Sequence, residues 1–307
     1  MRPQSIGLAC ALLGAVGFSF KAILVKAAYR YGVDPETLLA LRMLYSLPLF
    51  LLMGYTARNA AEPIRPSDWR ALLVLGVLGY YGSSYLDFLG LRHISAALER
   101  LILFVYPTIV VLYGAWRMRR APARPTLIAL ALCYAGVALV VTHDVRAGSG
   151  NVLIGGTLVF ASAVCYAAYL LGAARILTRL GSTRVAAWAT LVACVAALLQ
   201  FVLLRPPGLA LAQPWQVQAL SAAMAVFSTV LPIWLVSEAI RRLGAAPTAM
   251  IGSLGPPITM LMAALLLGEA LGLMQLVGAA LVIVGVRMVA AAETVIPAAA
   301  ANKLARP

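Results

Sequence analysis

Charged residues are scarce in this sequence of 307 residues. Only 11% of its residues are charged and 63% are hydrophobic, whereas soluble domains contain about 25% charged and about 45–50% apolar residues. Apolar residues in such excess, gathered in long runs, are typical of segments that cross a bilayer. The shortage of charge therefore excludes an ordinary soluble domain and indicates an integral membrane protein.

Residues for metal, redox or hydrolytic chemistry are also few. The four cysteines lack CxxC spacing, the two histidines lie near predicted span ends, and HExxH, GxSxG and P-loop motifs are absent. We predict no metal, no cofactor and no enzymatic activity, although an intramembrane enzyme remains the alternative from another class. The net charge of +14 comes from arginines and lysines in short loops, where they set topology, so nucleic acid is not an expected partner.

Ten apolar segments predict an all-α membrane protein with ten transmembrane helices. Their approximate ranges are 5–28, 36–57, 69–91, 94–116, 125–143, 152–174, 184–204, 215–240, 243–267 and 270–291. With the N-terminus inside, sixteen basic residues lie on the inner side and four in the outer loops. The positive-inside rule thus predicts that both termini are cytoplasmic, with residues 293–307 as a disordered tail.

An internal repeat divides the chain into residues 1–146 and 147–292. The two halves share residues at an offset of 148–149, for example Pro107 with Pro256. Because five helices is an odd number, the second copy is predicted to be inverted in the membrane. Inverted repeats are common in transporters, whose substrate sites lie near the midplane beside interrupted helices.

Motifs near the end of the second copy, and in the link between the third and fourth predicted spans, resemble a known family. They are Gly268-Glu269, Gly278-Ala279 and Gly285-Val286, together with the stretch 89–97. On these residues the sequence, from Ile6 to about Ala291, resembles the drug/metabolite transporter superfamily, specifically its EamA-type ten-helix exporters. Arg119-Arg120 depart from the pattern in the first copy, where a glycine-glutamate pair is often found.

The resemblance implies a function and a location. Such proteins move amino acids, drugs and other metabolites across a bilayer without ATP hydrolysis, by proton-linked, exchange-linked or gradient-driven transport. The likeness to bacterial aromatic-amino-acid exporters implies export of aromatic or neutral amino acids across the bacterial inner membrane, by alternating access. The alternative within the superfamily is a nucleotide-sugar or sugar-phosphate antiporter.

Ionisable residues within the predicted spans are candidates for the transport site. Lys21, Arg42, Asp87 and Glu99 all fall in the predicted outer half of the membrane, where they can form one network. We expect Lys21 or Arg42 to meet a substrate carboxylate, and Asp87 or Glu99 to bind a proton or an ammonium group. Two basic residues suit one carboxylate better than a diphosphate. Arg100 is a fifth ionisable residue in these spans. The alternative is a purely structural ion-pair cluster or, for Arg100, snorkelling to the surface.

Aromatic residues at helical spacing form a second set of candidates. A tyrosine offers a flat apolar face and a hydroxyl group to an aromatic substrate, although tyrosines also anchor helices at membrane surfaces. The predicted cavity-lining residues are Tyr81, Tyr85, Tyr106, Tyr166, Tyr169, Trp234, Ser253 and Pro256.

Overall fold

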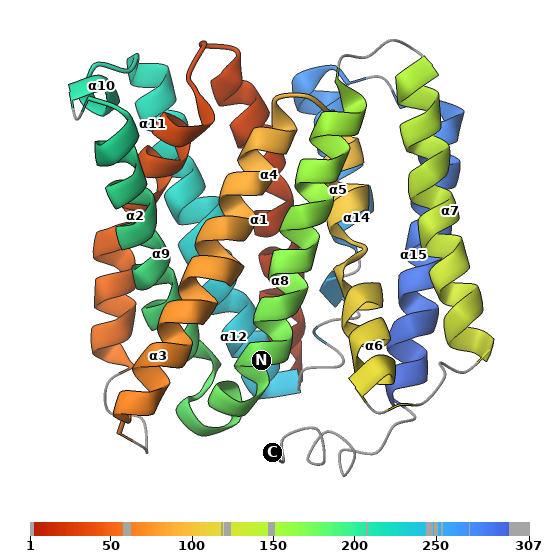
Figure 1. Cartoon of the computed structure of the whole chain (residues 1–307), viewed down its shortest axis with the longest axis horizontal. Coiled ribbons are helices and arrows are strands. Elements are labelled where there is room, and N and C mark those ends of the chain that lie inside the picture. The colour runs from red at the N-terminus through yellow and green to blue at the C-terminus, as the bar shows by residue number, and fades with distance from the viewer. Residues whose placement is uncertain are drawn as a thin grey trace.

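The computed structural model is a bundle of long helices (Figure 1). It describes residues 3–57, 63–117, 119, 124–146, 151–206, 208–243, 248, 251–252, 254–269 and 271–294. Within these ranges every secondary-structure element is a helix, in agreement with the predicted all-α class. The predicted tail lies, from residue 295 onward, outside the described residues.

The helices follow one another with short connections. The first half of the chain contains α1 (Pro3–Tyr29), α2 (Pro35–Thr56), α3 (Pro66–Leu75), the π-helical η1 (Gly76–Gly82), α4 (Ser83–Leu91), α5 (Ala96–Leu103), α6 (Tyr106–Arg117) and α7 (Arg124–Arg146). The second half contains α8 (Val152–Leu180), α9 (Ser182–Leu204), α10 (Gly208–Leu211), α11 (Trp215–Ala225), η2 (Val226–Val230), α12 (Leu231–Leu243), α14 (Gly255–Met262), η3 (Ala263–Leu267) and α15 (Leu273–Thr294).

Eight helical stretches in the described residues are long and apolar enough to cross a membrane, and they coincide with the first eight predicted spans. Two shorter apolar helices, Gly255–Leu267 and Leu273–Met288, lie within the ranges of the ninth and tenth. The total of ten crossings stays a prediction. Leucines on the outward faces, such as Leu199, Leu203 and Leu265, are more than half-exposed, as expected of a surface that meets lipid.

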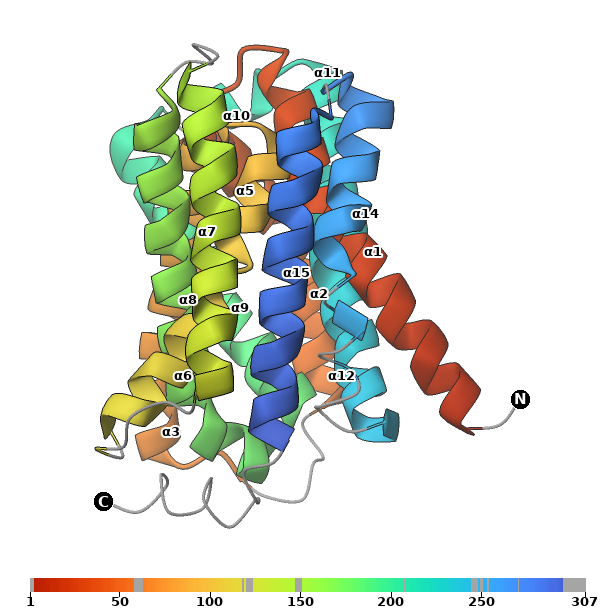
Figure 2. The same ribbon diagram turned by 90° about the vertical axis from the view of Figure 1, so that its right-hand side faces the viewer.

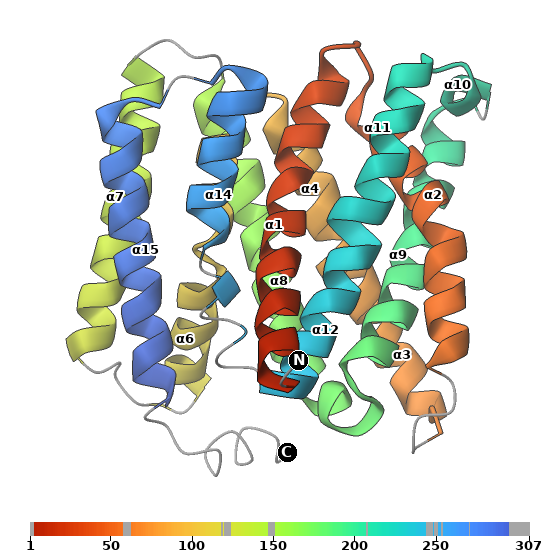
Figure 3. The same ribbon diagram turned by 180° about the vertical axis from the view of Figure 1, so that it is seen from behind.

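The two halves of the chain pack against each other in a reciprocal pattern. Helix α1 packs on α12, and α8, the first long helix of the second half, packs on α4. Helix α2 packs on α9, and α7 packs on α15, so equivalent helices also meet. Figure 3 shows α1 beside α12 and α15 beside α7 from behind. A Cβ atom on Gly278 would lie 2.8 Å from the carbonyl oxygen of Gly136, so glycine at this position permits the close approach of α7 and α15.

Two spans are interrupted at equivalent positions. Helix α5 ends at Leu103 and α6 begins at Tyr106, while α14 begins at Gly255 after a turn at Leu254. The two starting residues are 149 positions apart, the offset of the sequence repeat, and each is followed by a proline. Proline is favoured in the first turn of a helix because its missing N–H group is not needed there.

The start of α1 and the end of α15 lie at the same end of the bundle (Figure 2). We call this the terminal end, and the opposite end, where α1 finishes at Tyr29, the loop end. At the loop end, Asp34 caps α2 by accepting a hydrogen bond from the backbone of Thr37.

Candidate functional site

Three buried ionisable residues meet inside the bundle. The Lys21 Nζ atom lies 2.7 Å from Asp87 Oδ2 and 3.3 Å from Glu99 Oε1. The Lys21 side chain is 14% exposed, Asp87 is 1% and Glu99 is 0%. The three come from α1, α4 and α5, so the structure places three of the four predicted ionisable residues in one cluster, which we call the charge triad.

Local capping fixes the position of Glu99 in the charge triad. Ser95 precedes α5, and its Oγ atom accepts a hydrogen bond from the backbone N–H of Leu98 at 3.1 Å. This cap starts α5 at Ala96 and leaves Glu99 at the first turn, facing α1 and α4. Among the described residues, no group of three or more histidine, cysteine or acidic side chains has the arrangement of a metal site.

Arg42, the fourth predicted ionisable residue, has other partners. Its Nε atom donates a hydrogen bond to Thr229 Oγ1 at 2.9 Å, and its guanidinium lies 5.4 Å from the ring centre of Phe88. The side chain is buried, and within the described residues its Nη1 atom has no hydrogen-bond partner. Thr229 belongs to η2, so Arg42 ties α2 to the interrupted helix of the second half, and it also interacts electrostatically with Asp87 of the charge triad.

The predicted tyrosines fall into two groups. Tyr106 and Tyr166 meet edge to face at 4.9 Å between ring centres, and Tyr166 stacks with Tyr169 at 5.9 Å. Tyr169 also lies 3.2 Å, hydroxyl to hydroxyl, from Tyr80, a residue that the sequence did not single out. This group joins α6, α8 and η1, where a Cβ atom on Gly79 would collide with the Tyr169 side chain.

Tyr81 and Tyr85 form the second group, on the side of α2 and α9. Their rings stack at 6.2 Å, they pack against the cluster that contains buried residues of α2, and the Tyr85 hydroxyl donates to Glu36 at 3.1 Å. Trp234 is 48% exposed and takes part in none of the ring pairs found in the described part of the chain. Pro256 is buried in the first turn of α14, and Ser253 lies outside the described residues.

Arg100 is a central residue for which the sequence left snorkelling to the membrane surface as an alternative. A Cβ atom on Gly255 would lie 3.0 Å from Arg100 Nη2 and 3.5 Å from its Nε atom, so the guanidinium lies against the start of α14. Its Nε atom is buried and has no hydrogen-bond partner in the described residues. Helix α5 contacts α1, α4, α7, α8, α14 and α15. Because these helices surround α5, Arg100 lies inside the bundle.

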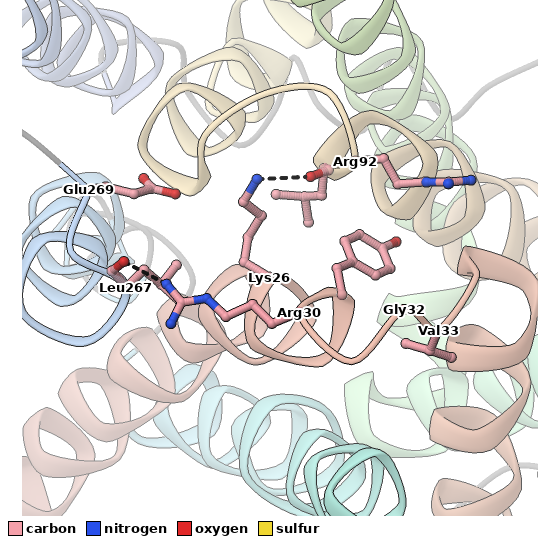
Figure 4. A pocket seen from close by; sticks show the side chains of 9 residues that line it. Lys26, Arg30, Gly32, Val33, Arg92, Leu267 and Glu269 are labelled. Carbon is pink, nitrogen blue, oxygen red and sulfur yellow. Dashed lines mark hydrogen bonds between the residues drawn. The ribbon is translucent and has the colours of Figure 1, made fainter. Parts of the chain in front are cut away.

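A pocket of about 530 Å³ opens at the loop end (Figure 4). It lies between the end of α1, the α4–α5 connection and the chain after η3. It is lined by Lys26, Tyr29, Arg30, Gly32, Val33, Leu91, Arg92, Leu267 and Glu269. This pocket was not predicted, because its residues come from three segments that are distant in the sequence.

Charged side chains in this pocket bind the ends of helices. Lys26 Nζ donates to the carbonyl oxygens of Leu91 and Ile94, at 3.3 and 3.0 Å. Arg30 Nη2 donates to the carbonyl oxygen of Leu267 at 2.6 Å. Glu269, from the Gly268-Glu269 motif, accepts from the backbone N–H groups of residues 96 and 97 at the start of α5. Cations at helix C-termini and an anion at a helix N-terminus complement the helix dipoles.

Known proteins have sequences similar to that of this chain over most of its length. The model of the EamA-like transporter family matches residues 5–142 and again residues 153–291. The chain is 32% identical over 284 residues to the "Uncharacterized transporter YcbK" of Bacillus subtilis (strain 168), covering 91% of this chain and 90% of that protein. It is 25% identical over 303 residues to the "Uncharacterized transporter sll1319" of Synechocystis sp. (strain ATCC 27184 / PCC 6803 / Kazusa), covering 90% and 91%.

A solved crystal structure has the same fold. It is similar over 93% of this chain and 95% of its own, with a TM-score of 0.62 and 19% sequence identity. The family match covers both halves of the chain, including every residue of the charge triad. The chain therefore belongs to the EamA-like transporter family of the drug/metabolite transporter superfamily, and it is a multi-pass membrane transporter.

Proposed function

We propose that this transporter exports amino acids, aromatic or neutral, across the bacterial inner membrane in exchange for protons. The observation that carries the proposal is the charge triad of Lys21, Asp87 and Glu99. Charged side chains inside a bilayer are costly, by about 2.5–3.5 kcal/mol each on insertion scales, and they mark ion or substrate pathways. Such a cluster has no evident purpose in a protein that only needs to span the membrane.

The composition of the charge triad supports proton exchange. Two carboxylates face one ammonium group, and their bonded oxygens lie within about 6 Å of each other because both contact the same Nζ atom. Asp87 also interacts electrostatically with Arg42, and Glu99 with Arg100, so five ionisable residues share this region. The two carboxylates repel each other, and a proton shared by the pair relieves that repulsion. Release of this proton when a cationic group approaches then links proton movement to the cargo.

Arg100 and the ring pair of Tyr106 and Tyr166 form the proposed cargo site. Lys21 is already neutralised by two carboxylates, so Arg100, whose Nε atom is unpaired in the described residues, is better suited to bind a carboxylate. The two edge-to-face rings offer apolar surface to an amino-acid side chain. This revises the expectation that Lys21 itself meets the substrate carboxylate.

The transport cycle that we propose is alternating access between two inverted five-helix repeats, residues 1–146 and 147–292. The reciprocal packing of α1 on α12 and α8 on α4 supports this division, as do the equivalent interruptions before Tyr106 and Gly255. The double match to the family model also supports it. With both termini cytoplasmic, as the arginine distribution predicts, the loop end is the outer end of the protein.

Counterflow in proteoliposomes tests the proposal. Vesicles loaded with unlabelled phenylalanine, tryptophan or threonine receive the labelled amino acid outside. We expect saturable exchange for at least one of the three by the wild type, and a loss of at least about 10-fold in a charge-neutral variant that combines Lys21→Met, Asp87→Asn and Glu99→Gln, since each removed charge contributes well over 1.4 kcal/mol.

A matched control separates this effect from a general loss of charge. Glu238 and Arg242 form an ion pair of 2.6 Å on α12, in the predicted inner part of the membrane and away from the triad. The Glu238→Gln variant is expected to exchange amino acids at the wild-type rate. Absence of exchange for all three amino acids by folded wild-type protein rejects the amino-acid assignment, and full exchange by the charge-neutral variant shows that the triad is needed neither for cargo binding nor for the conformational cycle.

A further inference from the structure

The charged side chains that line the loop-end pocket have both hydrogen-bond donors and hydrogen-bond acceptors that are not used within the described structure. Lys26 has three N–H donors, of which two are directed at Leu91 and Ile94, and Arg30 has five, of which one is bonded to Leu267 in the described structure. Each oxygen of Glu269 accepts one backbone hydrogen bond, at 3.0 and 3.4 Å, and each has a second lone pair. The pocket therefore presents available hydrogen-bond donors on Lys26 and Arg30 and available acceptors on Glu269.

These three side chains border one space. Figure 4 shows Lys26 between Glu269 and the α4–α5 connection, with Arg30 extending below it toward Leu267. The pocket volume of about 530 Å³ lies within the range of about 300–1,000 Å³ typical of small-molecule sites. None of its lining residues belongs to the charge triad or to the proposed cargo site around Arg100.

We propose that this pocket is a second binding site, which takes a zwitterionic amino acid at the outer mouth of the transporter. Lys26 and Arg30 bind the carboxylate, and Glu269 binds the ammonium group. A ligand with two or more negative charges fits less well, because it meets the Glu269 carboxylate. The choice of ligand rests on the proposed function, since the amino acid here is the cargo that the central site exchanges.

Ligand-induced thermal stabilisation tests the proposal in the full-length charge-neutral variant with Arg100→Gln added, because these substitutions remove both the triad and the residue proposed to bind the cargo carboxylate. Phenylalanine is expected to raise the melting temperature of this variant in a saturable way. N-acetylphenylalanine lacks the ammonium group and phenylalanine methyl ester lacks the carboxylate. Each is expected to bind at least about 10-fold more weakly, as when one charged hydrogen-bonded partner is lost.

Substitutions in the pocket identify where the ligand binds. Adding Arg30→Gln or Glu269→Gln to the variant used for thermal stabilisation is expected to weaken phenylalanine binding by at least about 10-fold, whereas Arg30→Lys keeps the charge and most of the affinity. Arg92 is the matched control, because it also borders the pocket but its guanidinium points away from Lys26 and Glu269 in Figure 4. The Arg92→Gln variant is expected to bind as the parent does.

The outcomes distinguish this site from the proposed function. No stabilisation by phenylalanine, or stabilisation that survives both Arg30→Gln and Glu269→Gln, overturns the second site, and amino-acid exchange by the wild type then still stands. Stabilisation that requires Arg30 and Glu269 in a protein without exchange activity supports the second site and rejects the transport assignment.

Discussion

Removal of Lys21 alone is predicted to destabilise the protein more than removal of the whole charge triad. The Lys21→Met variant leaves Asp87 and Glu99 buried, within about 6 Å of each other, without their cation. Breaking a buried ion pair from one side costs about 3–5 kcal/mol, and the 14% exposure of Lys21 favours the lower end of that range. We therefore expect a loss of about 3 kcal/mol in the free energy of unfolding.

The charge-neutral variant is the informative comparison. Methionine, asparagine and glutamine are similar in volume to the residues they replace, and none of them is charged, so that only Arg42 and Arg100 remain as cations nearby. Replacing a buried ion pair by neutral residues is often close to neutral in stability. We therefore expect this variant to recover about 2 kcal/mol or more relative to Lys21→Met, a coupling energy typical of residues in direct contact.

Unfolding by SDS in mixed micelles, followed by the loss of helical circular dichroism, measures both values. A loss below about 0.5 kcal/mol for Lys21→Met would place it among ordinary surface substitutions and refute the burial argument. A charge-neutral variant at least as unstable as Lys21→Met would refute the coupling. Stability recovered without recovery of exchange would show that the charges are retained for transport and not for folding.

Three further predictions concern contacts outside the triad. Gly278→Ala is expected to lower the free energy of unfolding by about 1–3 kcal/mol, because its Cβ atom would meet Val140 at 2.4 Å and the Gly136 carbonyl oxygen at 2.8 Å. Gly114→Ala is the control: its Cβ atom would meet no atom within 4 Å, and we expect no loss of stability. Thr229→Val removes the acceptor of Arg42 and is expected to cost about 1.5–3 kcal/mol in the same SDS titration, with Ser228→Ala, whose hydroxyl bonds only within its own helix, as the milder control. Glu269→Ala removes the carboxylate at the start of α5 and is expected to cost about 1–2 kcal/mol, and an unchanged unfolding midpoint would contradict that contact.

The sequence was sufficient to predict the features that depend on depth in the membrane. Apolar run lengths located the first eight spans, and the break at Arg92-His93 is present as the turn between α4 and α5. The number of residues from the end of each span, multiplied by the rise per residue of a helix, placed Lys21, Asp87 and Glu99 at a similar depth in the membrane. The structure brings these three residues into contact.

Features that depend on helix rotation and on distant partners were not predictable in this way. Arg100 has the same depth as Glu99, but its position against Gly255 requires knowledge of where α14 begins. Arg42 was expected in the same network as the triad and interacts electrostatically with Asp87, but its hydrogen bond to Thr229 of the π-helical η2 was not predicted. The Gly268-Glu269 motif was recognised by resemblance, whereas its bond to the start of α5, about 170 residues earlier, follows only from the fold.

Proton movement during amino-acid exit tests the central claim most directly, namely that the charge triad exchanges protons for cargo. Proteoliposomes are loaded with phenylalanine and a pH-sensitive dye, then diluted into buffer without amino acid. The account predicts that the vesicle interior acidifies as phenylalanine leaves through the wild type, and that Glu99→Gln abolishes the acidification. Exit through the wild type with no change in internal pH, or with alkalinisation, would contradict it.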